Sequence, residues 1–395
     1  MFGKRFELFQ IFGFKIRIDS SWFLLAILIT WSLATGYFPM VAEDLTTTTY
    51  WVMGAFGALG LFASVVFHEL SHSLMARQHG VEMEGITLFI FGGVAEMRDE
   101  PPSPKAEFQV AIAGPIASVV IAGVFWGFEL LGGALPYWSK EAGVVLGYLA
   151  FINVVLALFN LIPGFPLDGG RVLRSILWKT KGSLREASRI ASQVGSGFGV
   201  ALIVLGLISA LTGNLVGGIW WFILGLFLRG AARMSYRQVL LRQALEGEPV
   251  RRFMEDEPIT VPRSLSVREL VEDYIYEYHY PMFPVVDDGR LVGCVTTDEV
   301  QQLPREEWDR QSVGAILKQC GAGNTVAADE DAMEALSRMS REGTSRLMVV
   351  EGEELVGILT LKDLLDFFSK KIALEDLGGD GPVPEPTSLP GRPGR

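Results

Sequence analysis

The chain has few residues of the kinds that build disulfide-stapled domains or nucleic-acid-binding surfaces. Only 2 of its 395 residues are cysteines and only 4 are histidines. Cys294 and Cys320 match no metal-binding spacing, so we expect reduced structural thiols there. Charged residues make up 20% of the chain and sum to a net charge of -11, which argues against nucleic acid as a partner.

Charge is also absent from several long stretches, while hydrophobic residues make up 49% of the chain. Such runs are long enough to cross a bilayer as helices. The charge-free runs cover residues 20–42, 50–67, 108–128, 143–167 and 190–228. Residues 212–214 (Thr-Gly-Asn) split the last run into two short spans, so we expect about six transmembrane helices. A cleaved signal peptide is the alternative for the first run.

Lysine and arginine are unevenly distributed between the loops. Near the membrane they gather in residues 1–19, 76–107, 168–189 and the region after 229, whereas the alternate loops carry almost none. Cytoplasmic loops of membrane proteins are enriched in these residues. The sequence therefore predicts a multi-pass protein of the cell membrane with both termini in the cytoplasm.

Two of the four histidines stand in the pattern H-E-x-x-H at the end of the second apolar run. On a helix His68 and His72 share one face, so they can hold one Zn²⁺, and Glu69 beside them is a candidate general base. Ionisable residues at membrane depth are costly and therefore indicate function. We expect one zinc ion per chain, bound by His68 and His72.

A third zinc ligand is expected from the end of the fourth apolar run. Pro163 and Pro166 should break that helix, which leaves Asp168 on an unwound segment at the same membrane depth as the histidines. The alternative for Asp168 is to cap the helix that follows it. Asn160 is expected to orient substrate or to stabilise an oxyanion, with an inter-helix hydrogen bond as the alternative.

Residues 86–97 are apolar and β-branched but too short to span a membrane. Gly92 and Gly93 indicate a turn or bulge, so we expect a short re-entrant hairpin beside the helix that carries the histidines. We expect Gly92 and Gly93 to contact substrate, which would dock on the edge formed by residues 86–95. A hairpin that serves packing alone is the alternative.

Together these motifs resemble those of the site-2 protease family of intramembrane zinc metalloproteases. The matching residues are His68, Glu69, His72, Ala113, Gly114, Pro115, Asn160, Pro163, Pro166, Asp168, Gly169 and Gly170. The resemblance covers about residues 10–235. It implies zinc bound by His68, His72 and Asp168, Glu69 as the base, and cleavage of a transmembrane segment of a membrane-embedded protein.

The region of residues 249–371 contains an internal repeat with a period of about 64 residues. Residues 283–287 and 291–296 recur as residues 347–350 and 355–360, and an amphipathic helix precedes each pair. Each unit resembles a CBS domain, and such pairs commonly bind adenine nucleotides such as ATP or AMP through a Thr followed three residues later by Asp. Thr360 and Asp363 match this pattern, whereas Thr296 is followed by Glu299. A purely structural or dimerising pair is the alternative.

We therefore expect a polytopic α-helical membrane protein followed by an α/β tandem CBS domain. The expected parts are a metalloprotease domain over 1–235, a helical connector over 236–248, CBS repeats over 249–306 and 307–371, and a disordered tail over 372–395. The expected function is zinc-dependent intramembrane proteolysis near the cytoplasmic face, regulated by nucleotide. The expected partners are membrane lipid and a second copy of the chain, joined through the CBS pair. A CBS-regulated ion channel or transporter is the alternative function.

Overall fold

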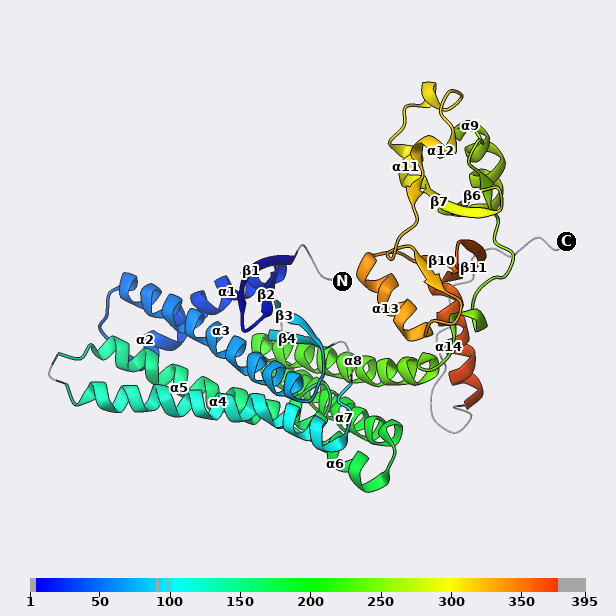
Figure 1. The fold of residues 1–395 in the computed structure, drawn as a ribbon. Coiled ribbons are helices and arrows are strands. Elements are labelled where there is room, and N and C mark those ends of the chain that lie inside the picture. The colour runs from blue at the N-terminus through cyan, green and yellow to red at the C-terminus, as the bar shows by residue number, and fades with distance from the viewer. Residues whose placement is uncertain (1–4, 90–91, 98–99, 136, 376–395) are drawn as a thin grey trace. The chain divides into compact units, whose positions relative to one another are not determined.

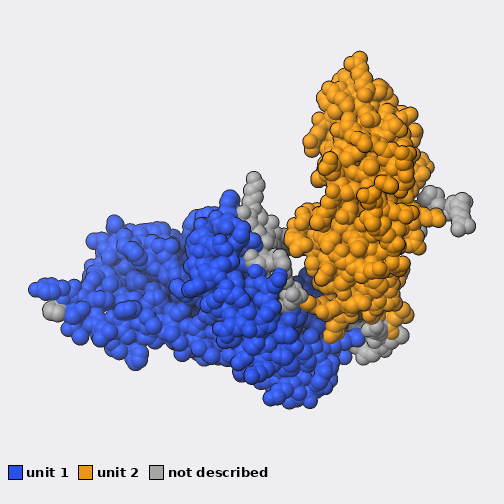
Figure 2. Space-filling view, viewed as in Figure 1, with its two compact units in different colours: residues 1–239 blue, residues 240–395 orange. Residues whose placement is uncertain are grey.

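A computed structural model describes residues 5–89, 92–97, 100–135 and 137–375. The chain divides into two compact units, Met1–Val239 and Leu240–Arg395, which Figure 2 distinguishes by colour. The units are described separately below.

Unit 1 is built on long apolar helices. Within the described residues, six helices are long and apolar enough to cross a membrane. The first, Ser20–Val41, comprises α1 (Ser20–Ser32), a π-helical turn (Leu33–Tyr37) and α2 (Phe38–Val41). The other five are α3 (Thr47–Gln78), α4 (Pro104–Gly133), α5 (Lys140–Asn160), α7 (Leu184–Leu211) and α8 (Leu215–Leu245). A shorter helix, α6 (Asp168–Lys181), lies between α5 and α7. This confirms the expected helical membrane fold.

Four strands form one mixed sheet in unit 1. They are β1 (Arg5–Ile11), β2 (Phe14–Asp19), β3 (Met83–Phe89) and β4 (Gly92–Met97), in spatial order β1-β2-β3-β4. The sequence predicted the β3–β4 hairpin, but it gave no strands to residues 5–19. The structure pairs β2 with β3 in parallel, and Ile16 and Ile86 lie together in the apolar core beside α3.

Helices α3, α4 and α5 pack against one another (Figure 1). Residues 212–214 separate α7 from α8 as expected, but these two helices are 28 and 31 residues long rather than short. Helix α8 also continues through most of the expected connector and ends at Leu245. The expected boundary at residue 235 therefore falls inside a helix.

Unit 2 contains a seven-stranded mixed sheet that both repeats share. Its strands are β5 (Val261–Pro262), β6 (Met282–Asp287), β7 (Arg290–Thr296), β8 (Lys318–Gln319), β9 (Thr325–Ala327), β10 (Arg346–Glu351) and β11 (Glu354–Thr360). Its helical segments are Val250–Arg252, Val267–Glu269 (α9), Leu270–Ile275, Tyr276–Tyr278 (α10), Thr297–Gln301 (α11), Arg305–Glu307, Val313–Ile316 (α12), Ala332–Glu342 (α13) and Leu361–Glu375 (α14).

Each repeat of unit 2 places a short strand, a helix, a hairpin and a second helix in order, and the helix before each hairpin is the one that the sequence predicted. The hairpins β6–β7 and β10–β11 occupy equivalent positions, and β7 pairs with β11 at the centre of the sheet. Helix α14 includes residues 372–375, which the sequence analysis had assigned to a disordered tail. The rest of that expected tail lies outside the described residues.

Candidate metal centre

The two histidines of the H-E-x-x-H motif lie on helix α3, which is long enough to carry them well inside unit 1. Thr46 caps the start of this helix, because its side-chain oxygen accepts a hydrogen bond from the backbone N–H of Thr49. His68 and His72 are one turn apart and only 3% and 4% exposed. Their rings therefore point from one face of α3 into the protein interior.

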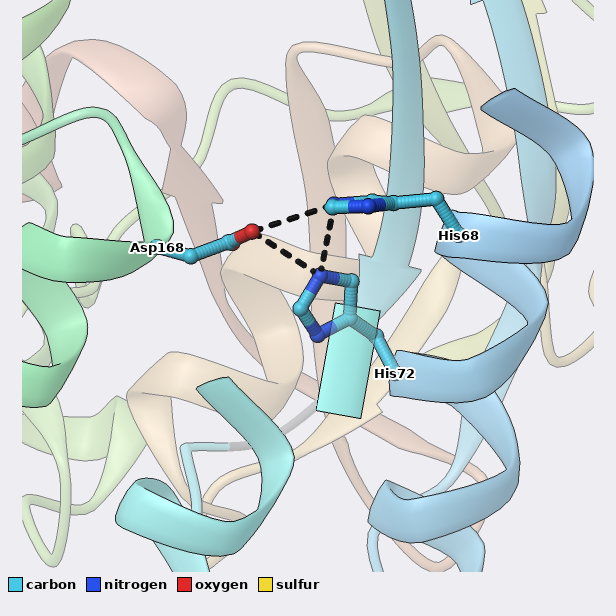
Figure 3. A group of neighbouring side chains, drawn as sticks. All are labelled: His68, His72 and Asp168. Atoms are coloured by element: carbon cyan, nitrogen blue, oxygen red, sulfur yellow. Dashed lines mark hydrogen bonds and ion pairs between the residues drawn. The ribbon is translucent and has the colours of Figure 1, made fainter. Parts of the chain in front are cut away.

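Asp168 reaches the same point from another part of the chain. It is the first residue of α6, and it follows the irregular segment between α5 and α6 that the two prolines were predicted to produce. Its Oδ2 lies 3.1 Å from His68 Nε2 and 3.2 Å from His72 Nε2. The two Nε2 atoms are 3.2 Å apart (Figure 3). The structure thus brings together all three predicted ligands.

The spacing and chemistry of these atoms fit Zn²⁺. Donors around a tetrahedral zinc ion with bonds of about 2.0–2.1 Å lie about 3.3 Å apart. The Nδ1 of His72 donates to the backbone oxygen of Val110 at 2.7 Å, so Nε2 is the nitrogen that remains to bind a metal. Two imidazole nitrogens and a carboxylate oxygen are the kinds of donor atom that Zn²⁺ prefers in proteins.

Asp168 is suited to bind a cation at neutral pH. Burial by itself would raise the pKa of its carboxyl group. The nearby imidazoles of His72 and His68 act in the opposite direction and outweigh burial, so the pKa of Asp168 lies below its ordinary value. The carboxylate is therefore ionised over the physiological pH range.

Helix α4 supplies the surroundings of both imidazoles. Ser118 Oγ is 2.8 Å from His68 Nδ1, and the Val110 carbonyl holds His72 as described above. Between these two residues lies Gly114, where a Cβ atom would come within 2.2 Å of His72 Nε2. The sequence analysis had listed Gly114 only among the residues that carry the resemblance, without a role in the site. In the structure its missing side chain leaves room for the donor atoms.

Glu69 follows His68 on α3 and faces the hairpin. A Cβ atom at Gly93 would lie 2.7 Å from Glu69 Cγ, so strand β4 approaches the candidate base very closely. Gly92 begins the same strand with a φ of 129°, which favours glycine. Within the described residues β4 pairs only with β3, which leaves its outer edge available for another strand. The hairpin and the candidate base are therefore neighbours.

Asn160 is not part of the cluster of three donors. It is the last residue of α5, is half-buried, and precedes Asp168 by eight residues. A different asparagine of α5, Asn153, is fully buried and donates from Nδ2 to Ser64 Oγ on α3 at 2.9 Å. A hydrogen bond between helices, which was the alternative for Asn160, is thus made by Asn153, about two helical turns earlier on α5.

The candidate nucleotide-binding residues occupy equivalent positions in unit 2. Thr360 caps α14, and its N and Oγ1 donate to Asp363 Oδ2 at 3.2 and 2.6 Å. Thr296 caps α11, and both its N, at 2.9 Å, and its Oγ1 donate to Glu299 Oε2. The longer side chain of Glu299 therefore reaches the same two donors that Asp363 reaches in the other repeat.

Sequence reasoning missed Ser118 and Val110, which orient the two histidines, and it singled out Gly114 only as part of the resemblance. Ser118, Val110 and Gly114 lie at spacings of four residues on one face of α4, and that spacing was visible in the sequence. Nothing in the sequence indicated that this face turns toward the histidines of α3, since the contact joins residues about 40 to 50 positions apart.

The sequence of this chain is similar to those of known peptidases. The sequence profile of peptidase family M50 matches residues 56–134 and 136–205, and that of the CBS domain matches residues 250–304 and 324–370.

Similar proteins match over nearly the whole chain. A zinc metalloprotease of Methanocaldococcus jannaschii is 31% identical over 91% of this chain and 94% of its own length. A protein of Synechocystis sp. is 36% identical, covering 89% and 92%. Rip3 of Mycobacterium tuberculosis is 35% identical, covering 90% of each. The latter two are named as candidate zinc metalloproteases. The solved site-2 protease from Methanocaldococcus jannaschii is 30% identical, covers 59% of this chain and 95% of that one, and has a TM-score of 0.41.

Proposed function

Because this chain belongs to peptidase family M50 and is a zinc metalloprotease of the site-2 protease type with a CBS-domain pair, we propose that it cleaves membrane-spanning segments of other proteins. The cut falls near the cytoplasmic face. The alternative of a channel or transporter is set aside, because the similar proteins that match over nearly the whole chain are named as zinc metalloproteases.

The observation that carries this proposal is the cluster of His68, His72 and Asp168 with Glu69 beside it. These three residues would hold one zinc ion per chain, and a zinc ion bound there would supply the Lewis acidity that makes a water molecule nucleophilic at neutral pH. Glu69 accepts the proton of that water and later delivers it to the leaving amine. Asn160, at the end of α5, is assigned to orient the substrate backbone.

The substrate is a transmembrane helix that opens locally before it is cut. A peptide bond inside an intact helix is shielded by its own hydrogen bonds and side chains, so an extended stretch has to form first. Strand β4 offers an edge for that stretch, and at Gly93 it approaches Glu69. Strand addition at a sheet edge is a common way to bind extended peptides. The edge of β4 would therefore present the scissile bond to the base.

Glu69→Gln tests the assignment of the base. The variant retains every zinc ligand, so we expect full zinc content and loss of cleavage of a reconstituted transmembrane substrate. His68→Ala should lose both. Glu43→Gln, an exposed glutamate outside the cluster, serves as the matched control and should behave as wild type. Normal turnover by Glu69→Gln would overturn the proposal.

The orientation of the chain in the membrane forms part of the same proposal. The arginine- and lysine-rich loops indicate that both termini are cytoplasmic. Cysteines introduced at Thr47 and Gly213 should react with an impermeant thiol reagent from outside intact cells. One introduced at Lys181 should react only after permeabilisation. The opposite pattern would reverse the orientation.

The CBS pair is assigned to regulation by an adenine nucleotide and to homodimer formation. Thr360 and Asp363 in one repeat, and Thr296 in the other, supply hydroxyl and carboxylate groups suited to a ribose. A nucleotide changes activity only if it binds two conformations of the protein unequally. Light scattering of the detergent-solubilised protein measures whether the chain is a dimer.

A further inference from the structure

One face of α4 contacts His68 and His72, and α4 also packs against α6, the helix that begins with Asp168. Ser118 and Val110 hold the two imidazoles, and Gly114 leaves space between them. Three residues before Val110, the same face carries Glu107, whose side chain is 0% exposed. A buried carboxylate is costly unless it is paired with a positive charge. Glu107 therefore needs a partner, and the partner belongs to the helix that carries the third ligand.

That partner is Arg174 of α6, which is 3% exposed. Its Nε donates to Glu107 Oε1 at 2.5 Å, and its NH2 group donates to Glu100 Oε2 at 2.7 Å. Arg171, one turn earlier on α6, adds a second positive charge with its Nε 4.0 Å from Glu107 Oε1. The planar guanidinium thus joins α6 to α4 and to the segment that follows β4.

The guanidinium of Arg174 also contacts the stretch of chain that precedes Asp168. It lies over the ring of Phe165, 5.2 Å from the centroid, and Phe165 is in the segment that leads into α6. Arg174 therefore contacts the chain before Asp168 and anchors the helix after it. Helix α6 has only 14 residues and does not span the membrane, so the bilayer cannot fix its position in the way that it fixes α3 and α4.

We propose that Glu107 and Arg174 are positioning residues for the metal centre: their buried ion pair holds α6 so that Asp168 stays within reach of His68 and His72. This inference rests on the proposed function, in which Asp168 is the third ligand. It assigns the pair a role beyond stability, since the pair fixes the distance between a ligand on a short helix and two ligands on a membrane-spanning one.

The test measures zinc affinity of the full-length protein by competition with a chelator. Residues that orient metal ligands typically contribute 10- to 100-fold in affinity. We therefore expect Glu107→Gln and Arg174→Lys to weaken zinc binding by about 10- to 100-fold. Lys181→Met is the matched control, because Lys181, the last residue of α6, makes an exposed ion pair with Glu186 of α7. It should leave zinc affinity unchanged.

A second measurement separates positioning from general loosening of the fold. In an Asp168→Ala background, Glu107→Gln should cause no further loss of zinc affinity, because its effect passes through Asp168. An equal loss in both backgrounds would overturn the inference. If a single variant fails to fold, the apolar pair Glu107→Leu with Arg174→Met removes both charges together, and it should show the same background dependence.

The outcomes distinguish this inference from the proposed function. If Asp168→Ala loses zinc affinity while Glu107→Gln and Arg174→Lys retain it, the positioning role is wrong and the ligand set stands. If Asp168→Ala itself retains wild-type zinc affinity, both the ligand set and the positioning role are wrong.

Discussion

Among the residues of the candidate metal centre, Gly114 is closely constrained, because a side chain there would occupy the space between the two imidazoles. A Cβ atom there would lie 2.2 Å from His72 Nε2 and 2.6 Å from His68 Nε2. Gly114→Ala should therefore abolish zinc binding without removing a ligand. Gly123→Ala on the same helix is the control, because nothing lies within 4 Å of its Cβ position. Zinc content by atomic absorption measures both, and equal metal in the two variants would contradict the packing argument.

Ser118 acts on zinc through His68. Its hydroxyl is fully buried and bonds His68 Nδ1, which fixes the ring so that Nε2 points toward Asp168. Ser118→Ala should weaken zinc binding by about 10- to 100-fold, measured by chelator competition. Ser71→Ala is the control, since the Ser71 hydroxyl donates to the backbone oxygen of Phe67 on its own helix. An unchanged zinc affinity in Ser118→Ala would mean that packing alone orients His68.

At the scale of elements, the edge strand β4 should govern substrate binding rather than metal binding. A side chain at Gly93 would meet Glu69 Cγ at 2.7 Å. Gly93→Val should push the strand away from the base, so cleavage should fall at least about 10-fold while zinc content stays full. Zinc content is the internal control. Cleavage at the wild-type rate would show that β4 is not held close to Glu69 during turnover.

The substrate element has its own requirement. If the cut needs a locally opened helix, substrates with Gly, Asn or Pro near the scissile bond should be preferred, because these residues disfavour helix. Replacing them with Leu should slow cleavage by the reconstituted enzyme. A matched substrate with the same replacement one turn farther from the cut serves as control. Equal rates for all three substrates would remove the opening step from the proposal.

At the scale of the whole molecule, regulation depends on the CBS pair. An adenine nucleotide is expected to bind mainly through Thr360 and Asp363, because the carboxylate of Asp363 can accept both hydroxyls of a ribose. Asp363→Ala should weaken nucleotide binding to the full-length protein, measured by calorimetry, and abolish any effect of ATP or AMP on cleavage.

Glu299→Ala is the matched control for that experiment. Glu299 accepts the same two hydrogen bonds at the start of α11 that Asp363 accepts at the start of α14, so both substitutions remove an equivalent helix cap. A larger loss of binding in Asp363→Ala than in Glu299→Ala then reports on the ligand. Equal losses would show that only the caps matter, and the absence of any nucleotide binding would leave the pair as a dimerisation module.

Local patterns in the sequence were enough to predict the long apolar helices and the candidate zinc ligands. In a bilayer a segment must satisfy its own backbone hydrogen bonds, so an apolar run of sufficient length is a helix whatever surrounds it. The two histidines share a face because the helical period places residues four apart together. Pro163 and Pro166 end α5 for an equally local reason, since proline lacks the N–H that a helix requires.

The contacts around the candidate metal centre came from the fold and not from local patterns. It brings Asp168 to within 3.1 Å of His68 across 100 residues of chain, turns Gly114 and Ser118 toward the imidazoles, and joins Glu107 to Arg174. It also pairs β2 with β3, which gives residues 5–19 strands that their own sequence did not reveal. These contacts depend on how helices and strands pack at long sequence separation. Packing depends on how whole surfaces fit together, and the local periodicity of a sequence does not predict which surfaces will meet.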